Sequence, residues 1–142
     1  MSSPSHIVCA VRGQPQSRAT VTKAIDLALE HGARLTFVHV MDAEFLAYAT
    51  VGIVRLMYRE LRSMGEFMME ILKDRAERRG VPEVDTVLLE GRVEEELPRF
   101  LEESGADLLV LGAPARNALS PEAFSTLVRR VAALGIRMEL IA

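Results

Sequence analysis

Short apolar runs alternate with amphipathic helical segments along this chain, and this alternation strongly limits how the chain can fold. The apolar runs cover residues 6–11, 35–41, 84–89, 108–111 and 136–141, and such runs are typical of strands buried in a parallel sheet. In four segments between them, apolar residues recur at steps of three and four, as in amphipathic helices. The pattern predicts a single α/β domain over 1–142, a three-layer sandwich with a five-stranded parallel sheet and helices on both faces.

Composition and charge exclude several classes of protein. The chain is 49% hydrophobic and 26% charged, as in ordinary globular domains, and its net charge of -3 argues against a nucleic-acid partner. No apolar stretch approaches the ~20 residues that span a bilayer, and no basic segment precedes the first apolar run. A single cysteine, Cys9, fits a reducing compartment. We therefore expect a cytoplasmic protein without a membrane partner.

Residues 43–79 are expected to be mostly helical. Apolar residues at steps of three and four predict a buried stripe on this helix, made of Met57, Leu61, Met64, Met68, Ile71 and Leu72. The part at 45–58 carries more apolar surface than one stripe needs, including Phe45, Tyr48 and Ile53. Two interpretations remain open for it: additional core, or a flap or contact surface over a ligand cleft.

The segment 106–128 is the strongest candidate for a ligand site. An apolar strand ends at Gly112, and a loop of small residues then leads to a helix expected from about Ser125 to Leu134. Ligands of open α/β sheets bind beyond the carboxyl ends of the strands. The N–H groups of Ser125 to Leu127, at the expected start of the helix, would favour an anion.

Three segments together resemble the universal stress protein family over nearly the full length of the chain. They are IVCAVRGQPQSRATVTKAIDLAL, LTFVHVMD and ADLLVLGAPARNALSPEAFSTLV. The resemblance implies a sheet of order 3-2-1-4-5 with a cleft between the first and fourth strands. It also implies a homodimer, a role in the stress response and, in one branch of the family, ATP in the cleft.

The ATP-binding branch has a glycine-rich phosphate loop, and this chain departs from it. Gly112 and Thr126 match the loop, whereas Ala115 and Ser125 replace two of its glycines, and Arg12 stands where that branch usually has an aspartate. If the loop needs a positive φ at Ala115, the methyl group costs about 1–2 kcal/mol. The departures predict weak or no ATP binding; the alternative is an ATP- or AMP-binding protein that uses the loop at 112–126.

The candidate ligand-binding residues come from the ends of three strands and from the last helix. They are Arg12, Gly13, Val40, Gly112, Ala115, Arg116, Asn117, Ser125 and Thr126. We further hypothesise that Arg12, Arg18 and Arg116 converge on a small anion or on a differently oriented nucleotide.

An enzymatic function has little support in the sequence. The chain has no nucleophile elbow, no metal-ligand spacing and no dinucleotide fingerprint after the first strand. No catalytic or metal-binding residue is therefore expected. The sequence favours a non-enzymatic regulatory or binding module, with no certain cofactor and with an unknown protein as a further candidate partner.

The last apolar run, IRMELI, is expected to form a sheet edge. An uncovered apolar edge strand tends to pair with another chain. Antiparallel pairing about Met138 would place Arg137 opposite Glu139 of a second copy. We therefore expect a homodimer with an interface that includes Arg137, Met138, Glu139 and Leu140.

Overall fold

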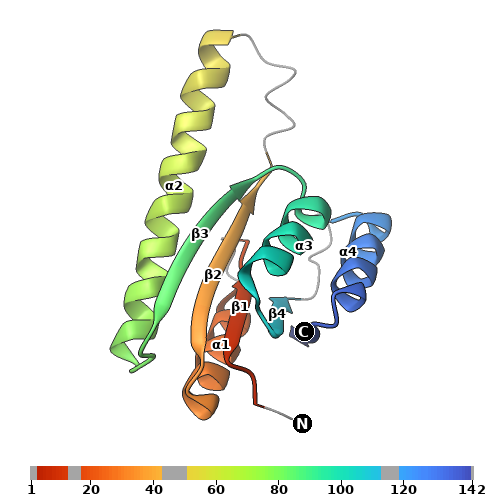
Figure 1. Ribbon diagram of the computed structural model, residues 1–142. Helices are drawn as coiled ribbons and strands as arrows, with labels where there is room; N and C mark the ends of the chain where they lie inside the picture. The colour runs from red at the N-terminus through yellow and green to blue at the C-terminus, as the bar shows by residue number, and fades with distance from the viewer. Residues whose placement is uncertain (1–2, 13–16, 43–50, 113–118, 142) are drawn as a thin grey trace.

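A computed structural model describes residues 3–12, 17–42, 51–112 and 119–141 of the chain (Figure 1). Five strands alternate with four helices in this part of the chain. In order they are β1 (His6–Ala10), α1 (Ser17–His31), β2 (Arg34–Met41), α2 (Val51–Arg78), β3 (Val84–Glu90), α3 (Val93–Ser104), β4 (Leu108–Gly112), α4 (Pro121–Ala133) and β5 (Arg137–Ile141). The predicted alternation is confirmed, with strand bounds that differ by at most one residue from those expected.

The strands form one parallel sheet in the order β3-β2-β1-β4-β5, which confirms the expected topology. The central strand β1 is buried along its whole length and pairs with β2 on one side and β4 on the other. Cys9, at its middle, lies between Phe37 and Val110 and is fully buried. Burial raises the pKa of its thiol, so Cys9 is an unreactive core residue.

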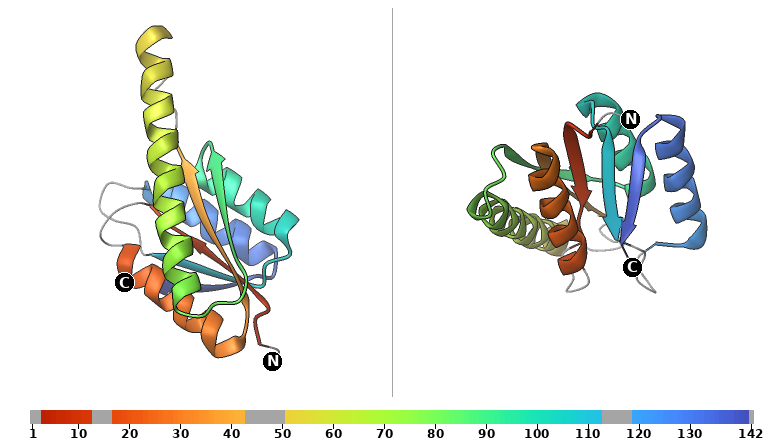
Figure 2. Two further views of the ribbon diagram at one scale, coloured as in Figure 1. Left: turned by 90° about the vertical axis from the view of Figure 1, so that its left-hand side faces the viewer. Right: turned by 90° about the horizontal axis from the view of Figure 1, so that it is seen from below.

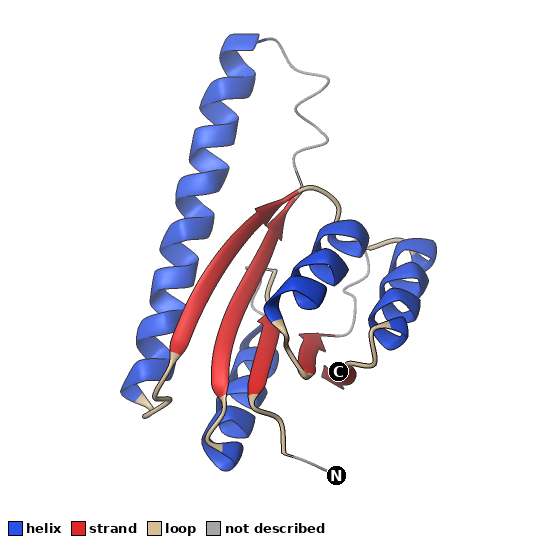
Figure 3. Ribbon diagram, in the orientation of Figure 1, coloured by secondary structure: helices blue, strands red, loops and turns tan. Residues whose placement is uncertain are grey.

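Helices cover both faces of the sheet (Figures 2 and 3). Side chains of a strand alternate between the faces, so Ile7 and Cys9 belong to the core beneath α1 and α2. Val8 and Ala10 belong to the second core, beneath α3 and α4. This alternation decides which side chains of β1 and β2 face α1 and α2 and which face α3 and α4.

Helix α2 differs from its sequence-based prediction. Its amino-terminal half extends beyond the strands (Figures 1 and 2), and its first buried residue is Gly65. Met57, Met64 and Ile71 of the predicted buried stripe are exposed, whereas the face toward the sheet carries Gly65, Met69 and Ala76 as its buried residues. Met68 and Leu72 of the predicted stripe do pack against the core. The amino-terminal part is exposed because 28 helical residues span about 42 Å, longer than the strands they cover. Ile71 is exposed because the helix turns another face, that of Met69 and Ala76, toward the sheet.

The segment at 45–58 had two interpretations, additional core or a flap or contact surface over a ligand cleft. Phe45 and Tyr48 lie outside the described residues. Ile53 is exposed, so it adds nothing to the core, and no residue of α2 lies among the described residues that line the main cavity. Despite the length of α2, none of the described helices is both long and apolar enough to cross a membrane.

Helix α3 contains Pro98 as its sixth residue, beyond the first turn of the helix. A proline at this position has no N–H to donate to the carbonyl oxygen of Glu94, four residues earlier. Nη1 of Arg130, on α4, donates to that carbonyl oxygen at 3.3 Å. Pro98 itself is buried, so a contact between α3 and α4 compensates for the missing helical bond.

Candidate functional site

The carboxyl ends of the strands surround a cavity of about 590 Å³. The order in which strands are added to the sheet switches direction at β1. The chain passes from β1 to β2 and β3 on one side, and it then crosses to β4 and β5 on the other side. In open α/β sheets this switch point is where ligands bind. The lining comes from β1, β2 and β4, from the segment between β3 and α3, and from the start of α4.

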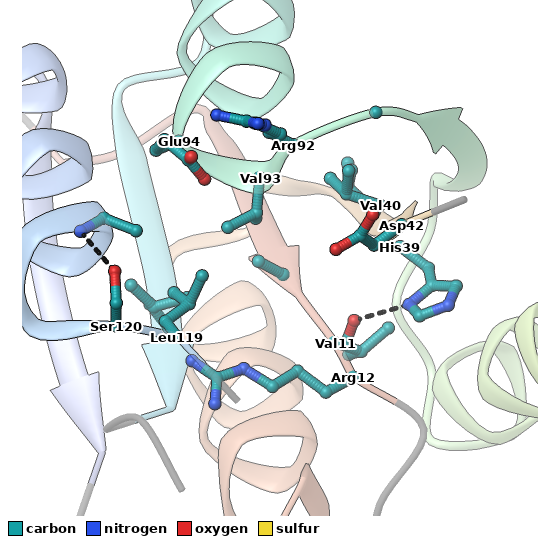
Figure 4. A pocket seen from close by; sticks show the side chains of 15 residues that line it. Val11, Arg12, His39, Val40, Asp42, Arg92, Val93, Glu94, Leu119 and Ser120 are labelled. Carbon is teal, nitrogen blue, oxygen red and sulfur yellow. Dashed lines mark hydrogen bonds between the residues drawn. The ribbon is translucent and has the colours of Figure 1, made fainter. Parts of the chain in front are cut away.

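Arg12 extends into this cavity from the end of β1. The alternation of β1 carries Arg12 to the same face as Val8 and Ala10, the face covered by α3 and α4. In Figure 4 its guanidinium group lies near Leu119 and Ser120, across the floor of the cavity. Burial lowers the pKa of Arg12, yet a guanidinium group keeps its charge in proteins. The cavity therefore contains a partly desolvated cation.

The rest of the rim carries charges of both signs. Arg92 and Glu94, at the start of α3, lie on the far side of the cavity from Arg12, and Asp42 follows β2 (Figure 4). The amino ends of α3 and α4 both open on the cavity, through Val93 and Ser120. Because a helix amino end carries a partial positive charge, both ends add to the positive potential.

His39 is held by the backbone of β1. Its Nδ1 lies 2.9 Å from the carbonyl oxygen of Val11, which accepts a hydrogen bond from the ring. The ring belongs to the α2 side of the sheet, where its Cδ2 lies 3.6 Å from the position a Cβ would take on Gly65. His39 thus lines the cavity with its ring fixed by the backbone of β1. Among the described residues, no group of three or more His, Cys, Asp or Glu is arranged to hold a metal ion.

The start of α4 differs from the sequence-based prediction. The helix begins at Pro121, and the side chain of Ser120 caps it by accepting a hydrogen bond from the N–H of Ala123 at 3.1 Å. Ser125 and Thr126 therefore lie in the second turn, where their N–H groups are used within the helix. The expected start at Ser125 was wrong because serine followed by proline is itself a helix-start signal, and the prediction overlooked it.

Gly112 ends β4 against α1. A Cβ at this position would lie 2.9 Å from Oγ1 of Thr20, which is closer than real Cβ atoms come to other atoms. Thr20 is buried on α1. The close approach of α1 to β4 thus explains the glycine by packing, independently of any phosphate.

The structure brings together only part of the predicted site. Arg12 and Val40 line the cavity, whereas Gly112, Ser125 and Thr126 do not. Arg18 lies beside Ile141 in a separate shallow hollow and is not among the described residues that line the cavity with Arg12. Gly13, Ala115, Arg116 and Asn117 lie outside the described residues.

Sequence reasoning missed the contribution of the segment between β3 and α3. Gly91, Arg92 and Glu94 line the cavity, with Asp42 after β2. Gly91 has a φ of 136°, and a Cβ there would lie 2.8 Å from Cγ of Glu96. Gly91 comes directly after the strand predicted at 84–89, and this position at a strand end could have indicated that the segment lines a cavity.

These features define an α/β protein with a cavity at its topological switch point, and sequence comparison identifies the family. The sequence model of the Universal stress protein family matches residues 4–133, and the chain belongs to this family. A relative from Staphylococcus haemolyticus, named as a universal stress protein, is 30% identical over 121 residues, covering 84% of this chain and 72% of the relative.

Solved structures share the fold over nearly the whole chain. A universal stress protein family member from Burkholderia pseudomallei has a TM-score of 0.76 and 26% identity, covering 99% of this chain and 98% of its own. A universal stress protein in complex with cAMP has a TM-score of 0.69 and 17% identity, covering 99% and 98%. The protein from Archaeoglobus fulgidus in complex with dAMP has a TM-score of 0.68 and 16% identity, covering 99% and 100%. At such identities these two likenesses establish the fold.

Proposed function

We propose that this protein is a non-enzymatic binding module of the stress response whose cavity takes a small anionic ligand and binds ATP weakly or not at all. The observation that carries the proposal is the side chain of Arg12, which extends into the cavity at the switch point of the sheet. A partly desolvated cation gains most from a ligand that brings a negative charge.

The amino ends of α3 and α4 support the same ligand charge. Both open on the cavity, and Arg92 adds a second cation to its rim. Asp42, which lies on the β2 side in Figure 4, would accept hydrogen bonds from the opposite end of a ligand. A cavity of about 590 Å³ lies within the range of sites for small molecules. The ligand would therefore carry an anionic group at one end and hydrogen-bond donors at the other.

Three features weigh against tight ATP binding. The N–H groups of Ser125 and Thr126 are used inside α4, and the side chain of Ser120 occupies the N–H of Ala123. Gly112 has a packing role that does not need a phosphate. A triphosphate would thus find few free backbone donors at the start of α4.

An adenine mononucleotide is the second candidate ligand. The two solved structures in complex with cAMP and dAMP share this fold, and each ligand carries a single phosphate. Such a ligand would place its phosphate near Arg12 and its amine near Asp42. This candidate satisfies the requirement for a negatively charged group, and it identifies the rest of the ligand as an adenine nucleoside.

Titration calorimetry with phosphate, AMP, cAMP and ATP tests the proposal. We expect AMP, cAMP or phosphate to bind, with ATP no tighter than AMP. Arg12→Asp should abolish this binding, whereas Arg129→Asp, which makes the same change of charge at an exposed position on α4, should leave it unchanged. Tight ATP binding by the natural protein would contradict the proposal, as would equal affinities for the Arg12→Asp and natural proteins.

We also propose that the protein forms a homodimer through β5. This strand is the sheet edge, and Leu140 on it is 49% exposed. Pairing about Met138 would set Arg137 of each copy opposite Glu139 of the other. Glu139→Arg should weaken such a dimer, and an unchanged mass in solution would contradict this register. We place the protein in the cytoplasm, where a single buried Cys9 needs no oxidising environment.

A further inference from the structure

Glu94 contributes a carboxylate to the wall of the cavity. It lies in the first turn of α3 and is half-buried, and Figure 4 shows its side chain on the side of the cavity opposite Arg12. Within the described part of the chain, this carboxylate has no hydrogen bond or ion pair. The carboxylate of Glu96, in the same helix, is instead paired with Nη1 of Arg99 at 3.1 Å. The negative charge of Glu94 therefore acts on whatever occupies the cavity.

The backbone of Glu94 is held in place from two sides. Its carbonyl oxygen accepts the hydrogen bond from Nη1 of Arg130 at 3.3 Å, which ties the first turn of α3 to α4. On the other side, the side chain of Glu96 packs against Gly91, where a Cβ would lie 2.8 Å from its Cγ. The carboxylate of Glu94 thus extends into the cavity from a fixed point.

Burial decides which charges of the wall act most strongly on a ligand. Four charged side chains belong to the described lining, and of these Arg12 and Glu94 are half-buried, whereas Arg92 and Asp42 are exposed. Water and salt screen exposed charges more than partly buried ones. The potential inside the cavity is therefore positive on the side of Arg12 and negative on the side of Glu94.

We propose that Glu94 makes the cavity select ligands with a single negative charge, such as a phosphate diester or a carboxylate, over phosphate monoesters and polyphosphates. This inference rests on the proposed function, since it takes the anionic group to lie beside Arg12. The rest of the ligand would be uncharged and would donate hydrogen bonds from hydroxyl or amine groups toward Glu94.

The size of the cavity brings every ligand charge within reach of Glu94. A sphere of about 590 Å³ is about 10 Å across, which is close to one Debye length at physiological salt. A phosphate monoester carries a charge of about −1.5 to −2 at pH 7, whereas a diester carries a single charge. At about 10 Å, with partial screening, the repulsion by one carboxylate lowers affinity by roughly 3–10-fold for each ligand charge. The penalty therefore grows from diester to monoester to triphosphate.

Titration calorimetry with cAMP, AMP and ATP tests this selection, because the three ligands share adenosine and differ in charge. We expect the natural protein to bind cAMP more tightly than AMP, and AMP more tightly than ATP. Glu94→Gln should raise the affinity for AMP relative to cAMP by about 3–10-fold and the affinity for ATP by more. Glu94→Lys should extend the change in the same direction. Differences in shape between the ligands cancel, since the ratios are compared between variants.

Glu95→Gln is the matched control. Glu95 is the next residue of the same helical turn, it is exposed, and it is not among the described residues that line the cavity. This variant makes the same change in net charge and in the charge of the helix start, so it should leave the affinity ratios unchanged.

The outcomes separate this inference from the proposed function. If anion binding depends on Arg12 but Glu94→Gln and Glu95→Gln give the same affinity ratios, the selection by Glu94 is overturned and the proposed function stands. Tighter binding of AMP than of cAMP by the natural protein would also overturn the selection. If neither the natural protein nor Glu94→Gln binds any of the three ligands or inorganic phosphate, the proposed function fails and this inference fails with it.

Discussion

Gly112→Ala separates packing from ligand binding at the end of β4. The added Cβ would lie 2.9 Å from Oγ1 of Thr20, and Thr20 is 2% exposed on α1. Neither the strand nor the helix can move away cheaply, because both belong to the buried core. Overpacking of this kind costs about 1–3 kcal/mol. At an unfolding entropy of about 2.1 cal/mol/K per residue, the melting temperature should fall by about 3–10 °C.

A double-mutant cycle in urea assigns this cost to the contact. Thr20→Ala removes Oγ1 and with it the clash. Its effect on the free energy of unfolding should therefore be about 1–2 kcal/mol more favourable in the Gly112→Ala protein than in the natural protein. Thr20→Ser keeps Oγ1 and serves as the matched control, which should recover little. If packing explains Gly112, the folded Gly112→Ala protein retains its ligand affinity. Unchanged stability with lost affinity would refute the packing account and restore the glycine to a phosphate loop.

Three further predictions concern the stability of the fold. The pKa of His6 is lowered by burial and, to a smaller extent, by the charge of Arg34. The unfolded chain therefore binds a proton at a higher pH than the folded protein does, and stability should fall as pH drops below about 6.5. His6→Gln should reduce the dependence of the urea midpoint on pH in that range. Burial acts to raise the pKa of Asp107, but hydrogen bonds from Ser5 and His6 outweigh it and lower the pKa. This stability is present above about pH 3.9 and is lost as pH falls through the folded pKa, so Asp107→Asn should cost about 1 kcal/mol at pH 7 by urea unfolding and little at pH 2. Arg130→Ala should cost about 0.5–1 kcal/mol by the same measurement, because the carbonyl oxygen of Glu94 then loses the hydrogen bond that Nη1 of Arg130 donates to it.

The sheet was predictable because its signal is local and strong. The run from His6 to Ala10 is apolar at nearly every position, and a strand buried on both faces needs that composition. The strand order came from the family resemblance, which carries information that periodicity lacks. The stop of α1 was also readable, since Gly32 has a φ of 61° directly after the last helical residue.

The stripe on α2 was not predictable, because periodicity identifies an apolar face without saying what covers it. Met64 and Met68 both satisfy steps of three and four, yet only Met68 packs against the core. Which face turns inward depends on Gly65, where a Cβ would lie 3.2 Å from Cδ1 of Leu88 on β3. Only the positions of the strands reveal that approach.

The site was predicted in place but only partly in composition. Arg12 follows from the rule that ligands lie at strand ends, whereas Asp42 and Arg92 belong to loops that converge only in three dimensions. The error at Ser125 came from a misplaced helix start, since Ser120 and Pro121 supply the cap and the first helical residue. Short-range cap chemistry would have corrected it.

The central claim is that the cavity around Arg12 takes a small anionic ligand in preference to ATP. Mass spectrometry of the protein after gentle purification tests it most directly, because retained ligands are identified without choosing them in advance. The account predicts a phosphate or a mononucleotide that is retained by the natural protein and lost from Arg12→Asp, with no stoichiometric ATP. Stoichiometric ATP in the natural protein would contradict it.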